Sequence, residues 1–273
     1  LEHKQHVLQL PDTYIGSINI HEDELYVLNS DEATGKNSIV KKKVSYIPGL
    51  ISVFNEILVN VTDQWTRLQS ITKKGVRQLS EIRVNINQET GEISIENDGD
   101  GIDAVIIPEH GMFPIQLIFG MLLTSTNYNK KEKKVVGGKN GYGAKLTNIF
   151  STRFTVESVD RIRKKLVRID YHDNMIPLGD PIVSKWTKEP YTKVTFVPDF
   201  KRFGIEGLTD DIVSIMKKRV YDASAWTDDS VKVYLNGSLI ETKSFKDYVN
   251  MYLGAPEEYP RVHEKINSRW EII

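Results

Sequence analysis

The stretch Pro48-Gly49-Leu50-Ile51-Ser52-Val53-Phe54-Asn55-Glu56-Ile57-Leu58-Val59-Asn60-Val61-Thr62-Asp63-Gln64-Trp65 has the pattern of one long amphipathic helix. Pro48 suits the first turn of a helix, where an N–H group is not needed. Glu56, Asn60 and Asp63 share one stripe of such a helix, opposite the apolar side chains. The apolar side chains recur every three or four residues, at Leu50, Phe54, Ile57, Leu58, Val61 and Trp65. The helix therefore presents a carboxylate and an amide together, although an ordinary helix with one wet face has the same pattern.

Downstream of this helix, alternating apolar and polar residues predict the strands of one mostly antiparallel sheet. Segments 82–86 and 93–96, separated by 87–91, indicate a hairpin. Further strands are expected at 154–159, 165–171, 193–197 and 231–235, and further helices at 114–120, 142–150, 208–221 and 245–253. This order of elements predicts an α+β fold with helices on one face of the sheet.

The turn Asn97-Asp98-Gly99-Asp100-Gly101 follows the predicted hairpin. Its two glycines allow the backbone to approach a ligand closely. An ionised Asp98 could accept a hydrogen bond from an exocyclic amine such as that of adenine. Taken alone, however, Asp-Gly-x-Gly is more often a plain turn.

A glycine-rich loop, Gly137-Gly138-Lys139-Asn140-Gly141-Tyr142-Gly143-Ala144-Lys145, leads into the predicted helix at 142–150. Backbone amides at the start of a helix can bind phosphate oxygens, and Lys145 would add a positive charge. The loop lacks the Gly-Lys-Ser/Thr ending of a Walker motif. By itself it could equally be a flexible linker, and residues 124–143 together have the composition of a mobile lid.

The composition excludes several classes of protein. The 273 residues carry 36 basic and 37 acidic side chains, a formal net charge of -1, so no global field attracts a polyanion. There is no cysteine, which excludes a disulfide scaffold, a thiolate metal site and a cysteine nucleophile. No apolar run approaches the ~20 residues of a membrane span. The lysine-rich stretches 41–43 and 129–134 are expected to be solvated loops.

In this order, a Glu-x-x-x-Asn helix, an Asp-Gly-x-Gly turn and a glycine-rich loop resemble the GHKL superfamily of ATPases, which includes gyrase, Hsp90, histidine kinases and MutL. Longer segments resemble the type IIA DNA topoisomerases of the eukaryotic type. These segments are Pro-Asp-Thr-Tyr-Ile-Gly-Ser (11–17), Glu-Ile-Leu-Val-Asn (56–60), Leu-Leu-Thr-Ser-Thr-Asn-Tyr (122–128) and Gly-Tyr-Gly-Ala-Lys-Leu-Thr-Asn-Ile-Phe-Ser-Thr (141–152), and the resemblance continues to 267–271. It implies the GHKL (Bergerat) fold, a two-layer sandwich of a mixed, mostly antiparallel sheet with helices on one face.

The resemblance also implies an ATP site with Mg²⁺. Glu56 would be the general base that activates the water attacking the γ-phosphate. Asn60 would be a ligand of the metal ion, since an amide oxygen suits a hard cation. Lys145 and the metal ion would offset charge on the departing phosphoryl group. Asp63 and Arg67 would lie near the phosphates.

The remaining contacts to nucleotide are implied by their places in the motifs. Asp98 stands where the family has its adenine-recognising residue, which is Asn in the eukaryotic pattern and Asp in the bacterial one. Ile102 and Ile118 would form apolar walls of the base pocket, and Thr192 would lie beside the base. The other expected contacts are Gly99, Gly101, Ser125, Thr126, Asn127, Gly138, Asn140, Gly141, Tyr142, Gly143 and Ala144. Core packing or a solvated surface is the alternative for each of these side chains.

The sequence departs from the family pattern beside the site and at both ends of the chain. Asn55 replaces the acidic residue expected before Glu56, and Val61-Thr62 replaces a pair of small residues, changes that hydrolysis should survive. The arm that reaches the partner subunit would lie mostly before Leu1. The transducer domain, with a lysine that contacts the γ-phosphate, would lie after Ile273. Residues 1–265 are thus expected to be the ATPase domain and 266–273 the start of a truncated transducer.

In the family, ATP closes two such domains into a gate that captures a DNA duplex. The expected partners are therefore DNA and a second copy of the enzyme, with no membrane. The fragment alone is expected to bind nucleotide as a monomer or weak dimer with much reduced turnover. Its compartment would be the nucleus, the cytoplasm or the replication compartment of a large DNA virus.

Two competing hypotheses are a MutL-like or Hsp90-like ATPase and a degenerate module that serves as an interaction scaffold. The Pro-Asp-Thr-Tyr-Ile-Gly-Ser opening argues against the first. The intact Glu56 and Asn60 argue against the second.

Overall fold

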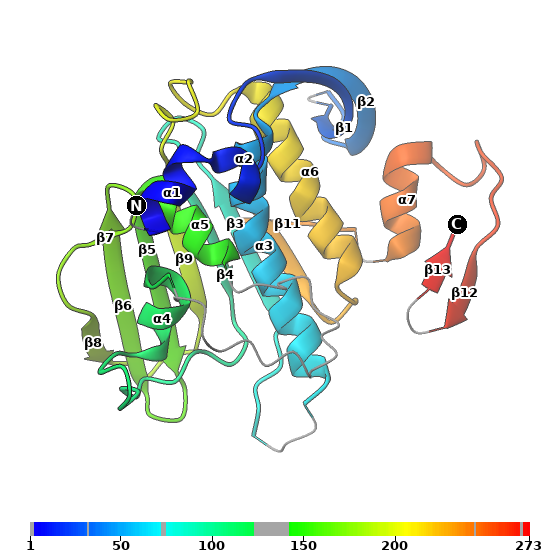
Figure 1. The fold of residues 1–273 in the computed structure, drawn as a ribbon. Coiled ribbons are helices and arrows are strands. Elements are labelled where there is room, and N and C mark those ends of the chain that lie inside the picture. Colours follow the sequence, from blue (N-terminus) through cyan, green and yellow to red (C-terminus); the bar gives the residue numbers. More distant parts are fainter. Residues whose placement is uncertain (1–2, 32, 72–74, 123–141, 243, 268–269) are drawn as a thin grey trace.

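A mixed sheet forms one layer of the fold, and helices α1, α3, α4, α5 and α6 lie on one face of it (Figure 1). The computed structural model describes residues 3–31, 33–71, 75–122, 142–242, 244–267 and 270–273. Its helices are α1 (His3–Gln9), α2 (Pro11–Tyr14), α3 (Pro48–Gln69), α4 (Pro114–Gly120), α5 (Gly143–Ile149), α6 (Asp210–Trp226) and α7 (Phe245–Leu253). The expected α+β sandwich with helices on one face is confirmed.

The strands are β1 (His21–Ser30), β2 (Asn37–Tyr46), β3 (Glu81–Ile86), β4 (Ile93–Asn97), β5 (Ser151–Asp160), β6 (Lys165–His172), β7 (Ile176–Pro177), β8 (Ile182–Lys185), β9 (Thr192–Pro198), β10 (Lys232–Leu235), β11 (Ser238–Leu239), β12 (Glu264–Asn267) and β13 (Trp270–Ile272). The large sheet has the order β11-β10-β3-β4-β9-β5-β6-β7, with β8 also paired to β6. Among its described pairings, β10 with β3 is parallel and the others are antiparallel. The expected mixed, mostly antiparallel sheet is therefore confirmed.

Helix α3 forms where the amphipathic pattern predicts it. Pro48 occupies its first turn, and the helix continues to Gln69, one turn beyond the predicted end. Its apolar face is buried against the sheet and the neighbouring helices α5 and α6. The buried positions include Leu50, Val53, Phe54, Ile57, Leu58 and Val61. This packing fixes the direction in which the opposite, polar stripe of the helix points.

Helix α6 extends the layer beside α3 and is longer than predicted, because it continues to Trp226. The Thr209 side chain caps its first turn by accepting a hydrogen bond from Ile212 N, 3.3 Å away. Asp210 and Asp211 place negative charge in that turn, where the helix dipole favours it. Helix α5 lies between α3 and α4, and its residues from Ala144 onward are buried.

The open face of the sheet carries a row of charges of alternating sign. Strand register places Arg83, Glu96, Lys193, Glu157 and Arg168 side by side across β3, β4, β9, β5 and β6. The Lys193 Nζ atom lies 3.7 Å from Glu96 Oε2. Opposite charges facing each other across strands stabilise a solvated sheet surface.

The hairpin of β1 and β2 was not predicted from the sequence. Lys41, Lys42 and Lys43 belong to strand β2, so the expectation of a solvated loop there is wrong. Each lysine contacts a carboxylate: Glu24 at 3.2 Å, Asp211 at 3.2 Å and Glu22 at 2.6 Å, respectively. The positive charge of this run is therefore neutralised locally.

The C-terminal residues form a two-stranded sheet of β12 and β13 beside α7 (Figure 1). The expected boundary between residues 265 and 266 falls inside strand β12. None of the helices in the described part of the chain has both the length and the apolar character needed to cross a bilayer.

Candidate active site

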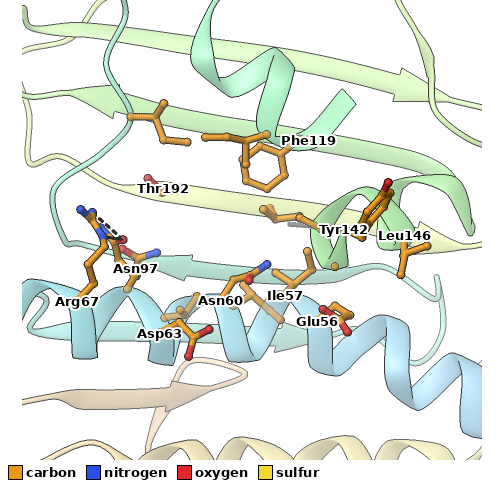
Figure 2. Close-up of a pocket in the computed structure, with 18 of the residues that line it drawn as sticks. Glu56, Ile57, Asn60, Asp63, Arg67, Asn97, Phe119, Tyr142, Leu146 and Thr192 are labelled. Carbon is orange, nitrogen blue, oxygen red and sulfur yellow. Dashed lines mark hydrogen bonds between the residues drawn. The ribbon is translucent and has the colours of Figure 1, made fainter. Parts of the chain in front are cut away.

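A cavity of about 880 Å³ lies between the polar stripe of α3 and the sheet, bordered by α4 and α5. Figure 2 shows Arg67, Asn97 and Thr192 at one end and Glu56, Tyr142 and Leu146 at the other. The structure brings many of the expected site residues together around it: Glu56, Asn60, Asp63, Arg67, Gly101, Ile102, Ile118, Tyr142, Gly143, Ala144 and Thr192.

Glu56 forms the acidic end of the cavity. Its carboxylate lies against Gly143, the first residue of α5, so closely that a methyl group on Gly143 would overlap Glu56 Oε2. Burial raises the pKa of Glu56, and the negative charge of Asp63 raises it further. The raised pKa makes the ionised carboxylate a stronger proton acceptor than an exposed one, which suits a general base.

Gln64 links helix α3 to the turn at 97–101. Its Nε2 atom donates a hydrogen bond to the Asp100 carbonyl oxygen, 3.1 Å away. Its Oε1 atom accepts two hydrogen bonds from the Arg67 guanidinium, at 3.1 and 2.9 Å (Figure 2). The guanidinium is thus held at the cavity rim beside the turn.

Three side chains lie in register across the sheet near the opposite end from Glu56, and two of them, Asn97 and Thr192, line the cavity. Asn97 on β4 pairs with Thr192 on β9, which pairs with Ser158 on β5. The Ser158 hydroxyl lies 2.8 Å from Thr192 Oγ1 and accepts a hydrogen bond from Ile102 N at 2.9 Å. The next residues on the same face are apolar, and Ile95 and Val194 line the cavity there.

Asp98, the expected adenine-recognising residue, does not line this cavity. Side chains alternate along a strand, so Asn97, which follows Ile93 and Ile95 on the buried face, points toward the helices. Asp98 instead lines a separate depression of about 390 Å³ with Arg77 and Ser80. The structure therefore places the Asn97 side chain, and not that of Asp98, at the cavity.

Gly99 and Lys145 are also absent from the cavity lining. A Cβ atom on Gly99 would lie 2.9 Å from Leu68 Cδ1, so this glycine permits close packing against the end of α3. Lys145 is 5% exposed, and burial lowers its pKa.

Six of the expected contacts, Ser125, Thr126, Asn127, Gly138, Asn140 and Gly141, lie outside the described residues, as does the lid segment up to residue 141. In the described part of the chain, no group of three or more His, Cys, Asp or Glu side chains is arranged to hold a metal ion.

Sequence reasoning missed several residues that line the cavity. Asn97 could have been found from the alternation of strand β4, and Gln64 from its place four residues after Asn60 on the same stripe. His3, Thr13 and Tyr14 reach the cavity from α1 and α2. No periodic pattern marks these two short helices.

Comparison with known proteins gives consistent relatives along nearly the whole chain. The chain is 44% identical to DNA topoisomerase 2 of Arabidopsis thaliana over 275 residues, covering 98% of the chain and 18% of that protein. It is 41% identical to DNA topoisomerase 2 of Acanthamoeba polyphaga mimivirus over 269 residues, covering 98% of the chain and 20% of that protein. No family model matches the chain.

Among solved structures, the ATPase region of Saccharomyces cerevisiae topoisomerase II has a TM-score of 0.88 and 41% identity. That similarity covers 99% of the chain and 68% of the solved one. The chain thus spans about a fifth of the length of its curated relatives and about two thirds of a solved ATPase region.

Proposed function

The chain belongs to the type II DNA topoisomerase family and matches its ATPase region, and from this premise we propose that it binds ATP in the cavity between α3 and the sheet and hydrolyses it. The observation that supports this most directly is the cavity itself, with apolar side chains beside the Asn97 carboxamide at one end and Glu56 at the opposite end. A purine base suits the first end and a triphosphate extends to the second.

Adenine would lie at the end formed by Asn97 and Thr192. A carboxamide carries both a donor and an acceptor, and it can pair with the adenine amine and an adjacent ring nitrogen at once. Ile95, Ile102 and Ile118 would contact the faces of the base. Asn97 would thus take the role expected of Asp98.

Glu56 would act as the general base. A water molecule attacks the γ-phosphorus, the bond from that phosphorus to the bridging oxygen of ADP breaks, and Glu56 accepts the proton released by the water. Gly143 leaves the space that the carboxylate occupies. The contacts expected from Ser125, Thr126, Asn127, Gly138, Asn140 and Gly141, and the role of Lys145, remain predictions.

The oxygen atoms that side chains near Glu56 offer suit a Mg²⁺ ion that binds together with the nucleotide. Mg²⁺ commonly takes one or two protein oxygens, with phosphates and water completing its coordination. Asn60 offers such an oxygen on the helix turn after Glu56. When bound, the ion would neutralise charge on the phosphates.

In the whole enzyme, we propose that ATP binding closes two copies of this domain around a DNA duplex. Residues 266–273 would begin the next domain, and this chain alone would dimerise weakly and turn over slowly. Sedimentation with and without a non-hydrolysable ATP analogue would measure the dimerisation. A full-rate ATPase from the chain alone would contradict the proposal.

Titration calorimetry with Mg-ATP tests the nucleotide site, with Glu56→Gln as the variant. We expect binding by both proteins and, in the full-length enzyme, a fall in hydrolysis of about 100-fold or more for the variant, the usual contribution of general base catalysis. If the well-folded chain gave no heat with millimolar Mg-ATP, the proposal would be wrong. Undiminished hydrolysis by the variant would remove Glu56 from its role.

A further inference from the structure

The side chain of Asp98 is the centre of a polar cluster behind the cavity. Its Oδ1 atom accepts hydrogen bonds from the backbone nitrogens of Ser80 and Glu81, at 2.8 and 2.7 Å. Its Oδ2 atom accepts from the Ser80 hydroxyl and from Arg77 Nη2, the latter at 3.2 Å. Arg77 Nε also donates to the Asp98 carbonyl oxygen at 2.7 Å. Both the side chain and the backbone of Asp98 are therefore fixed to the segment at 77–81.

The surroundings of Asp98 favour the ionised form of its carboxyl group. Burial by itself raises the pKa of Asp98, but the hydrogen bonds from Ser80, Glu81 and Arg77 outweigh it and hold the pKa below the usual value. Arg77 also pairs with Glu189, which is exposed. The carboxylate thus remains a charged acceptor under ordinary conditions.

The turn that contains Asp98 has little freedom to move independently. A Cβ atom on Gly101 would overlap the Val159 carbonyl oxygen on β5, so the backbone is in close contact there. Gly99 N donates to Asn97 Oδ1 at 3.2 Å, which orients the Asn97 carboxamide. A displacement of Asp98 is therefore transmitted to Asn97, the adjacent residue, and to the hydrogen bond that orients its side chain.

We propose that Asp98 and Arg77 are positioning residues for base recognition, which fix the turn at 97–101 so that the Asn97 carboxamide faces the base end of the cavity. The inference rests on the proposed binding of ATP. Asp98 would not touch the nucleotide. Replacing Asp98 would therefore change only the contribution that the base makes to nucleotide affinity.

The test compares ATP with inosine triphosphate, which carries a carbonyl oxygen in place of the adenine amine. Titration calorimetry on the 273-residue chain measures both affinities, in the presence of Mg²⁺, for the wild type, Asp98→Ala and Arg77→Gln. Asp98→Asn keeps an acceptor for the Ser80 and Glu81 nitrogens, so it should act as a partial rescue. Thermal melting identifies any variant that does not fold. If Asp98→Ala does not fold, the test rests on Arg77→Gln and Asp98→Asn.

Two matched controls separate positioning from general destabilisation. Asp211→Asn removes a carboxylate that also accepts from a backbone nitrogen, Ser45 N at 2.9 Å, but far along the chain from the turn. Glu189→Gln removes the negative charge of the other partner of Arg77. Both controls should retain the wild-type preference for ATP over inosine triphosphate.

We expect Asp98→Ala and Arg77→Gln to lower the affinity for ATP by about tenfold, the usual order for a lost charged hydrogen bond, and to leave that for inosine triphosphate unchanged. If both affinities stayed the same, or fell by an equal factor, Asp98 would be a purely structural residue and the inference would be overturned. A wild type that bound neither nucleotide would instead refute the proposed function on which the inference depends.

Discussion

Glu56 lies in surroundings that disfavour its ionised form. Burial and the neighbouring Asp63 raise its pKa above the ordinary 4.5 of a glutamate, so the folded protein retains the proton to a higher pH than the unfolded chain. Between the two pKa values the folded state therefore binds more protons. Its stability falls as the pH rises through this window, and the loss persists above it.

A Glu56→Gln variant should consequently melt at a higher temperature than the wild type at neutral pH, because it carries no charge to desolvate. At a pH below the ordinary pKa of glutamate, Glu56 is protonated in both the folded and the unfolded wild type, so the difference in melting temperature should vanish. Calorimetric melts at the two pH values measure the difference. An advantage of equal size at both would show that the charge of Glu56 costs the fold nothing.

Gly143 is the residue that makes room for the Glu56 carboxylate. Gly143→Ala should displace this carboxylate and lower stability by about 1–3 kcal/mol, the usual cost of overfilling a packed site. ATPase activity of the full-length enzyme should fall as well. Gly207→Ala is the control, since no heavy atom lies within 4 Å of its added methyl group. Equal melting temperatures and activities for the two variants would contradict the contact.

Asn97 and Asp98 show why the sequence located the site only to within a residue. The Asp-Gly-x-Gly turn marked the correct place in the chain, but either polar side chain could supply the acceptor. Only the pairing of β4 with β3 and β9 settles which of them faces the helices. Tyr14 and His3 could not be predicted at all, because their approach to the cavity depends on tertiary packing.

At the scale of elements, periodicity predicted those segments that bury one regular face. Helices α3 and α4 and the strands β3 to β6 and β9 appear within a few residues of their expected positions. Strands β1 and β2 were missed because their buried residues do not alternate; in β1, Val27 and Leu28 are buried consecutively. Strands β7 and β8 bury no residue, so their sequences carry no pattern to detect.

Helix α7 differs from the other long helices because none of its residues is buried. One of its contacts is made by Tyr248, whose hydroxyl donates to Asp222 on α6. Asp222 also accepts from Lys218 at 3.0 Å and from Arg219 at 2.8 Å. Arg219 in turn donates to Asn55 at 3.1 Å, next to Glu56. One carboxylate thus joins α7 to the helix that carries the proposed base.

Asp222→Ala should loosen α7 more than any other helix. Hydrogen exchange in residues 245–253 should accelerate, corresponding to about 1–3 kcal/mol less protection, the cost of leaving partly buried donors without an acceptor. The control is Asp228→Ala, which removes only a local turn contact to Ser230. Unchanged exchange in α7 would mean that other contacts hold the helix.

At the scale of the whole molecule, the two faces of the sheet have opposite characters. The face beneath the helices carries the apolar core, whereas the open face carries the charge row from Arg83 to Arg168. Glu96 lies between Arg83 and Lys193 in that row. Its charge therefore offsets two cations at once.

Glu96→Lys should place three cations in sequence and destabilise the fold by about 0.5–1 kcal/mol relative to Glu96→Gln. Added salt should narrow the difference, because exposed charges are screened. Denaturant titrations of both variants at low and high ionic strength measure it. A difference that does not respond to salt would indicate a packing effect instead of a charge effect.

The sheet also sets the order in which the chain can fold during synthesis. Strand β4 lies between β3 and β9. The other edge of β3 pairs with β10, which follows more than a hundred residues later in the chain. A nascent chain that has left the ribosome only as far as β6 would hold β4 and β5 with exposed edges and no strand between them. Such edges readily pair with other chains, so we expect this domain to depend on chaperone protection until its last central strands emerge.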